Sequence, residues 1–183
     1  MMTANAGSVA APNASEYAPY YGQYISLVQG NDILRALEEQ GKETVSLLSH
    51  LTEQQGDHRY TPGKWSIKEV IGHVTDTERI FAYRALRIAR NDPKPLEGFE
   101  QDDYVRAGGF GSRALGGLIE EFAAVRRASL LLLRSLDGEA WMRRGVANEK
   151  EVSVRALAYL IAGHELHHRK ILREKYLTSA AGA

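Results

Sequence analysis

Three of the six histidines in the chain lie within five consecutive residues, His164-Glu165-Leu166-His167-His168. The surrounding stretch, residues 157–176, has no proline and carries apolar residues at the spacing of an amphipathic helix: Leu157, Leu160, Ile161 and Ile171. At about 100° per residue, His164 and His168 fall inside this apolar stripe, and His167 lies on its flank. Buried imidazoles are costly unless their nitrogens have partners, and a divalent metal is a good partner. The pair therefore predicts either a metal site or two core histidines with hydrogen-bonding neighbours, and a third ligand would decide between them.

The candidate third ligand is His73, in a helix predicted over residues 66–90. Ser66 and Glu69 form a capping box at its start, and Asn91-Asp92-Pro93 ends it. His73 lies at the edge of the apolar face of this helix, a position that suits a pocket-lining residue better than a core residue. Three imidazoles, from His73, His164 and His168, would hold a zinc-like ion and leave a coordination position open for water or substrate. That arrangement is typical of catalytic metal sites.

The sequence contains no cysteine, so any metal must be held by histidine and carboxylate. Zinc suits three imidazoles, but nickel, iron and cobalt suit them too. The predicted cofactor is therefore a divalent metal ion, with Zn, Ni or Fe as the candidates. The histidines outside this set that lie near the end of the first helix, His50 and His58, are expected on the surface.

The same five residues also spell H-E-x-x-H, the motif in which zinc proteases use two histidine ligands and a glutamate base. In that interpretation Glu165 would be the general base. The sequence has no downstream H-x-x-G-x-x-H extension, and the only acidic residue that follows is Glu174, on another face of the same helix. No strand is expected that could hold an extended peptide substrate. The protease interpretation is the least favoured.

Composition indicates one soluble domain. The chain has 183 residues, of which 44% are hydrophobic and 25% charged, and its formal net charge is zero. A balanced charge gives no sign of the excess positive charge that binds nucleic acid or an anionic membrane. No apolar run approaches the length of a membrane span, and the first residues lack the basic and apolar regions of a signal peptide. We expect a cytoplasmic protein with neither nucleic acid nor membrane as a partner.

Hydrophobic periodicity predicts an all-α protein with four long helices. The first begins at Asn31 or Asp32 and ends before Gln54, and the third covers residues 112–136. Ser153 is a plausible cap for the last helix, and residues 152–154 are too short to count as a strand. Residues 1–15 are expected to form a disordered tail, and the tyrosine-rich segment 17–24 is expected to pack on the outside of the domain. Residues 92–111 form a long irregular connection, which would let the second and third helices run parallel.

Two blocks of the sequence resemble the DinB-like (DinB/YfiT) superfamily. They are residues 65–73, WSIKEVIGH, followed by Asp76 and Glu78, and residues 162–168, AGHELHH. The likeness covers nearly the whole chain after residue 17 and includes GFEQDDYV, before the third long helix. It implies a four-helix bundle with an up-down-down-up path over residues 16–178. It also implies a three-His divalent metal site made by His73, His164 and His168.

The resemblance implies a metal-dependent enzyme that transfers a low-molecular-weight thiol to a small molecule or hydrolyses it. The alternative is a non-catalytic bundle in which the metal joins two helices, or a stress-related binding protein. Asp76, Glu165 and Tyr104 are the candidates for acid–base or orienting roles. The expected partner is a small-molecule substrate, with a low-molecular-weight thiol as a candidate cosubstrate. A homodimer is left open as the oligomeric state.

Overall fold

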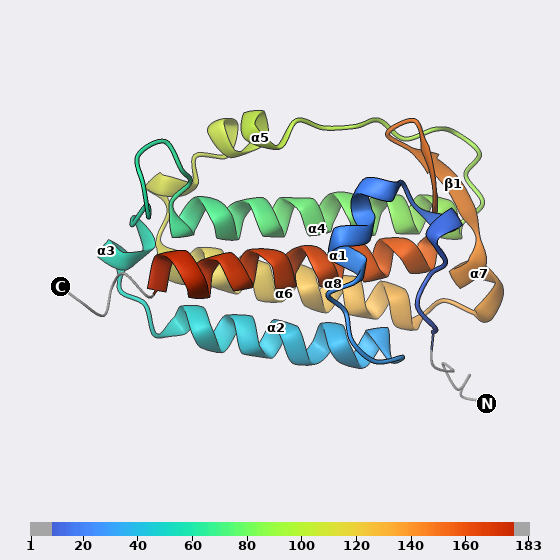
Figure 1. Ribbon diagram of the computed structural model, residues 1–183, viewed down its shortest axis with the longest axis horizontal. Coiled ribbons are helices and arrows are strands. Elements are labelled where there is room, and N and C mark those ends of the chain that lie inside the picture. The colour runs from blue at the N-terminus through green and yellow to red at the C-terminus, as the bar shows by residue number, and fades with distance from the viewer. Residues whose placement is uncertain (1–8, 178–183) are drawn as a thin grey trace.

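The computed structural model describes residues 9–177 and contains the four expected long helices (Figure 1). They are α2 (Ile33–Ser49), α4 (Ile67–Ala89), α6 (Leu115–Arg134) and α8 (Val154–Ile171). Helices α2 and α8 run in one direction along the long axis, and α4 and α6 run in the other. This is the up-down-down-up path, so the predicted all-α four-helix bundle is confirmed.

Side-chain caps fix where the long helices begin. The Ser66 hydroxyl accepts a hydrogen bond from the Glu69 amide, and the Glu69 carboxylate accepts one from the Ser66 amide at 2.6 Å. Asp32 caps α2 and Ser153 caps α8 in the same way, each through the amide three residues later. These caps satisfy amides that lack a partner within the first helical turn. The predicted helix starts are confirmed to within a few residues.

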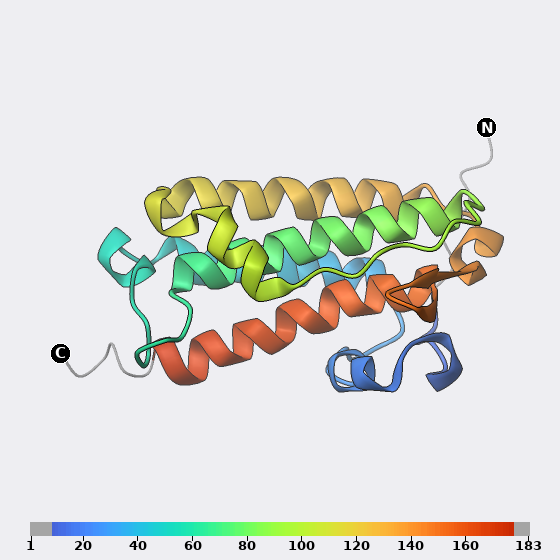
Figure 2. The same cartoon turned by 90° about the horizontal axis from the view of Figure 1, so that it is seen from above.

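The connection between α4 and α6 contains a helix that was not predicted, α5 (Gln101–Gly108), followed by a short 3₁₀ turn (Phe110–Ser112). The connection passes along the outside of α4 (Figures 1 and 2). The prediction of an irregular segment over 92–111 is wrong for α5. Only Val105 of this helix is buried, so it has no apolar stripe that a periodicity analysis could detect. The Phe110 ring packs directly against Gly72 of α4, since a Cβ added to Gly72 would lie only 2.4 Å from the ring. This contact holds the segment that follows α5 against α4.

A short hairpin precedes α8, where no strand was predicted. Strands β1 (Arg144–Ala147) and β2 (Lys150–Ser153) pair antiparallel, and Leu96 from the long connection bridges to β1. The turn residues Asn148 and Glu149 both have positive φ, 51° and 61°. Such turns usually carry glycine, and here no glycine marks it. With four residues per strand and no glycine at the turn, the hairpin has too weak a local signal to be predicted.

The chain before α2 forms short turns and lies beside α8 (Figure 2): Ala14–Glu16, Pro19–Tyr21 and α1 (Gly22–Ile25). Residues 1–8 of the predicted tail lie outside the described residues. Residues 9–15 contact the bundle, since the Tyr159 hydroxyl donates to the Val9 carbonyl at 3.0 Å. A Cβ on Gly163 would lie 2.1 Å from the Tyr24 carbonyl oxygen. Only glycine therefore lets α1 approach α8 this closely.

The remaining short elements are α3 (Glu53–Gly56), α7 (Gly138–Met142) and a π-helical turn (Leu172–Leu177) that extends α8. Within residues 9–177, no helix is both long and apolar enough to cross a membrane.

A buried ion network joins the four long helices at the centre of the bundle. The Arg126 guanidinium on α6 donates to Glu78 on α4 at 2.8 and 2.9 Å and to Glu165 on α8 at 2.8 Å. It also donates to the Leu37 carbonyl on α2 at 2.9 Å. The two carboxylates raise the pKa of Arg126 above its ordinary value, against the opposing effect of burial. The guanidinium therefore stays charged and holds all four helices at one level.

We predict that Arg126→Met strongly destabilises the protein. The substitution leaves two carboxylates buried without their counter-ion, which costs about 3–5 kcal/mol of unfolding free energy. Arg127→Met is the matched control, because Arg127 is exposed and its loss should change stability by less than about 0.5 kcal/mol. Urea denaturation measures both. Equal losses in the two variants would contradict the structural role given to Arg126.

A second prediction concerns Glu16, whose carboxylate pairs with Arg155 and accepts a hydrogen bond from Ser153 at 2.7 Å. Chiefly through the hydrogen bond from Arg155, this environment lowers the pKa of Glu16 from 4.5 to about 2. A carboxyl group with a lowered pKa stabilises the folded state at pH values above its ordinary pKa. That stabilisation is lost as the pH falls toward the folded-state pKa of about 2. Glu16→Gln should lower the unfolding free energy at pH 7 by about 2–3 kcal/mol.

The difference between wild type and Glu16→Gln should shrink as the pH is lowered from 5 toward the Glu16 pKa of about 2. Denaturation curves across this range test it. Glu151→Gln serves as control, because the Glu151 side chain is 68% exposed and its pair with Arg144 spans 3.6 Å. A pH-independent difference for Glu16→Gln would show that its carboxylate is not the group responsible.

Candidate metal centre

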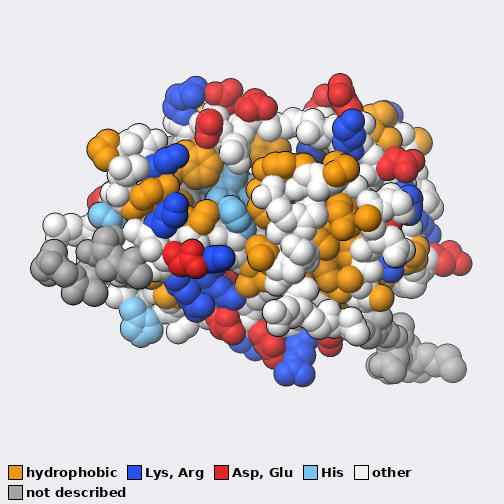
Figure 3. Space-filling view, viewed as in Figure 1, with side chains coloured by type: hydrophobic (Ala, Val, Ile, Leu, Met, Phe, Trp, Pro, Cys, Tyr) orange, Lys and Arg blue, Asp and Glu red, His pale blue; other side chains and the backbone are white. Residues whose placement is uncertain are grey.

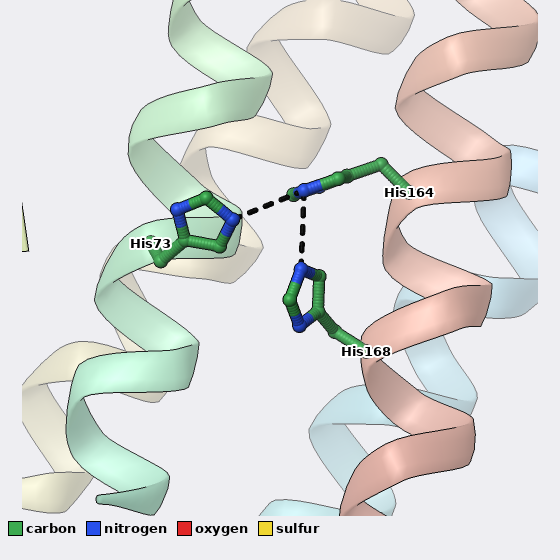
Figure 4. A group of neighbouring side chains, drawn as sticks. All are labelled: His73, His164 and His168. Carbon is green, nitrogen blue, oxygen red and sulfur yellow. Dashed lines mark hydrogen bonds between the residues drawn. The ribbon is translucent and has the colours of Figure 1, made fainter. Parts of the chain in front are cut away.

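Three histidines from two helices point toward one another in the middle of the bundle (Figure 4). His73 comes from α4, and His164 and His168 come from successive turns of α8. The His73 and His164 Nε2 atoms are 3.1 Å apart, and the His168 and His164 Nε2 atoms are 3.2 Å apart. Each residue offers a ring nitrogen within 4.8 Å of those of the other two. The three predicted ligands thus meet, although 91 residues separate His73 from His164.

The chemistry of these nitrogens fits a cation. A neutral imidazole nitrogen carries either one proton or one lone pair, so His164 Nε2 cannot make good hydrogen bonds to both neighbours at once. A metal accepts a lone pair from all three. Two nitrogens about 2.0–2.1 Å from a tetrahedral zinc lie roughly 3.3 Å apart, close to the Nε2 separations of 3.1 Å between His73 and His164 and 3.2 Å between His168 and His164. The donor set suits a divalent metal ion.

Burial favours the neutral, metal-binding form of these rings. It lowers the pKa of His73 to about 4 and places the pKa of His164 and His168 well below the usual value. Neighbouring histidines lower each of these pKa values further. His167, on the flank as predicted, faces Tyr24 with ring centroids 5.2 Å apart. The lone pairs at the centre are therefore free for a cation at neutral pH.

Two cavities open on either side of the histidines. The aromatic chamber, of about 290 Å³, is bordered by His73 and His164 and is walled by Tyr20, Tyr21, Tyr24, Phe81 and Phe99. The second chamber, of about 330 Å³, is bordered by His168 and is walled by Tyr60, Lys64, Trp65, Asp102 and Tyr176. Gln101, the first residue of α5, lines both. Histidine side chains are visible on this face between groups of hydrophobic side chains (Figure 3).

A family model of the DinB superfamily matches residues 36–172, three quarters of the chain. The match spans both helices that carry the histidines. The chain belongs to the DinB superfamily. The family resemblance predicted from residues 65–73 and 162–168 is confirmed.

Among solved structures, this DinB-superfamily chain is similar to YfiT from Bacillus subtilis. That protein is described as a probable metal-dependent hydrolase with an unusual four-helix bundle topology. The likeness has a TM-score of 0.65 and 16% sequence identity, over 88% of this chain and 91% of YfiT. This likeness supports the four-helix-bundle fold of the chain. No curated protein matches the chain.

The three predicted acid–base residues lie apart from the histidine nitrogens. Glu165 is fully buried and accepts hydrogen bonds from Arg126 and Thr44. Asp76 pairs with Arg79 at 3.0 Å on the same helix. Tyr104 is 48% exposed, and its ring packs against Phe99, with centroids 5.2 Å apart. None of the three lines either chamber as the structure describes them.

The tyrosine-rich segment, residues 17–24, was expected only to pack on the outside of the domain, and its role at the site was not predicted. It does pack against α8, and it also brings Tyr20, Tyr21 and Tyr24 to the wall of the aromatic chamber. The Tyr24 and His164 ring centroids are 5.6 Å apart. One signal could have indicated this contact: Gly163, the only glycine in the last helix, directly precedes His164. A glycine beside a ligand allows another backbone to come close.

We predict that His73→Ala lowers affinity for divalent metal by more than about 100-fold, because loss of an outer-shell partner alone costs 10–100-fold. His50→Ala is the control, since His50 is exposed and hydrogen-bonds only within its own helix region. Elemental analysis and Zn²⁺ titration of the purified proteins measure the effect. Equal metal content in His73→Ala and wild type would remove His73 from the ligand set.

Proposed function

We propose that this protein is a metal-dependent enzyme that activates a small nucleophile, water or a low-molecular-weight thiol, against a small-molecule substrate. His73, His164 and His168 would hold the divalent metal. The observation that carries the proposal is the convergence of three neutral imidazoles at a point bordered by two cavities. The printed description of YfiT as a probable metal-dependent hydrolase agrees with it.

A divalent cation at this position would supply Lewis acidity, which lowers the pKa of a bound water or thiol. The residues of the chain hold and orient the ligands. The Trp65 ring lies 4.7 Å from that of His73, and Tyr24 packs edge-on to His164, so both imidazoles are held by aromatic neighbours. Gln101, the first residue of helix α5, lines both chambers.

Two chambers suit a reaction between two small molecules. One can approach from the side of His168 and the other from the side of His73 and His164. Because the chain has no cysteine, a thiol nucleophile would have to arrive as a cosubstrate. Hydrolysis needs only water at the same position. The proposal therefore covers thiol transfer and hydrolysis, and the requirement for a thiol distinguishes them.

The protease alternative finds no support in the position of Glu165. A general base of a zinc protease must reach the water at the metal, within about 2.6–3.2 Å or through one water. Both Glu165 oxygens are engaged instead, one by Thr44 and one by Arg126 at 2.8 Å. The proposed reaction needs no proton transfer from Glu165, Asp76 or Tyr104.

We predict that turnover of small electrophiles depends on the metal and on all three histidines. Removing the metal with a chelator, or substituting His168→Ala, should lower the rate by about 10³-fold, which corresponds to several kcal/mol of lost charge stabilisation. Metal should restore the chelated wild type but not the variant. Activated esters and epoxides, each with and without cysteine or glutathione, form the assay panel.

His50→Ala is again the control and should keep wild-type rates. A rate that rises and saturates with thiol would identify thiol transfer, and a rate independent of thiol would identify hydrolysis. Stoichiometric metal without turnover of any pair would favour the alternative, a bundle whose metal only joins α4 and α8.

A further inference from the structure

The walls of the aromatic chamber are rings set steeply to one another. The Tyr20 and Tyr21 planes meet at 65° with centroids 5.6 Å apart, and the Tyr20 and Tyr24 planes meet at 77° with centroids 5.9 Å apart. Tyr21 and Phe81 are perpendicular at 6.3 Å. Rings arranged in this way offer both faces and edges to a guest in the chamber. An aromatic guest can stack on a face and meet an edge at the same time, which a saturated guest cannot do.

The charges around this chamber favour a neutral ring over a cationic group. The Arg84 guanidinium already lies 5.9 Å from the centre of the Phe81 ring. A divalent cation held by His73 and His164 would add more positive charge beside the same space. The carboxylate of Glu100, which lines the chamber, is exposed to solvent. A quaternary or primary ammonium group would therefore be repelled where a phenyl ring would not.

A hydroxyl without a partner marks the same chamber. Thr77 lies one helical turn after His73, is 3% exposed and lines the chamber. Its Oγ1 has no hydrogen-bond partner among the described residues. Thr75, two residues earlier, donates to the Ile71 carbonyl at 2.8 Å, which is the usual solution for a buried threonine in a helix. An orphaned buried hydroxyl costs stability, and a ligand with a polar atom would remove that cost.

We propose that the aromatic chamber binds an aryl group of the substrate, and that Thr77 hydrogen-bonds a polar atom between that ring and the metal. The inference rests on the proposed function, because it assumes that the substrate reaches the metal held by the three histidines. It adds the chemical class of the group bound there. The second chamber, with Lys64 and Asp102 at its wall, would hold the other reactant.

Three hydroxamic acids test the inference by binding rather than by turnover. Acetohydroxamic acid carries only the metal-binding head, benzohydroxamic acid adds an aryl ring, and cyclohexanecarbohydroxamic acid adds a saturated ring of similar size. Calorimetric titration of zinc-loaded protein should show benzohydroxamic acid binding about 3–10-fold tighter than the cyclohexyl compound, because only an aryl ring makes the aromatic contacts. The same compounds should not bind protein stripped of metal.

Substitutions in the two chambers test which of them holds the aryl ring of the ligand. Tyr20→Leu and Phe99→Leu keep apolar bulk, and because neither side chain is fully buried they should leave the fold intact. Each should bring the affinity for benzohydroxamic acid close to that for the cyclohexyl compound. Tyr60→Leu removes a ring from the second chamber and is the matched control, so it should leave the preference unchanged. Thr77→Val should weaken both ring compounds about 3–10-fold without changing the preference between them.

The possible outcomes separate the two proposals. Acetohydroxamic acid that binds only with metal, without any aryl preference, would leave the proposed function standing and overturn this inference. An aryl preference abolished by Tyr60→Leu and kept by Tyr20→Leu and Phe99→Leu would overturn it by placing the ring in the other chamber. Wild-type affinities in Thr77→Val would remove Thr77 from the ligand contacts. Failure of all three compounds to bind zinc-loaded protein would overturn the open metal position, and this inference with it.

Discussion

The buried guanidinium of Arg126 is the interaction on which the rest of the structure depends. It donates to a carboxylate on α4, to another on α8 and to a carbonyl on α2, and thereby fixes the spacing of all four long helices. Glu78 lies five residues after His73, and Glu165 directly follows His164. Gly41 on α2 leaves room for this side chain, since a Cβ there would lie 3.0 Å from Arg126 Cγ. A change in the ion network would therefore move the two helices that carry the imidazoles.

The network and the histidine cluster divide the polar interior of the bundle between them. Glu165 and His164 are neighbours in sequence, yet the carboxylate faces the guanidinium and the imidazole faces the ligand-binding side. A buried charge needs a fully satisfied set of partners, and Glu165 has them. Among the described residues, the hydrogen-bond contacts of the three imidazole rings are with one another. This difference explains why the motif H-E-x-x-H, shared with zinc proteases, serves separate purposes here: the glutamate holds helices together and the histidines offer lone pairs.

The chambers around the histidines come from segments outside the four-helix core. Glycine at 163 admits the backbone of α1 beside His164, and glycine at 72 admits Phe110, which secures α5 above α4. Both glycines directly precede a histidine of the cluster. Each thus replaces a side chain by a neighbouring segment, and those segments supply the tyrosines and Gln101 that enclose the site. The bundle gives the ligands, and the added segments give the shape of the space beside them.

The sequence by itself determined the four long helices, their starts and the three histidines. Those features depend on local signals: apolar periodicity, caps at Ser66 and Ser153, and imidazoles on one helical stripe. The long connection over residues 92–111 indicated that the second and third helices could run parallel, and the family resemblance supplied the complete up-down-down-up path. Tertiary structure alone decided the rest. Helix α5 has one buried residue and the hairpin turn has no glycine, so neither has a local signature. Arg126, the charged partner of Glu165, lies 39 residues away, and Tyr24 reaches His164 from the other end of the chain, because packing and not sequence spacing sets such contacts.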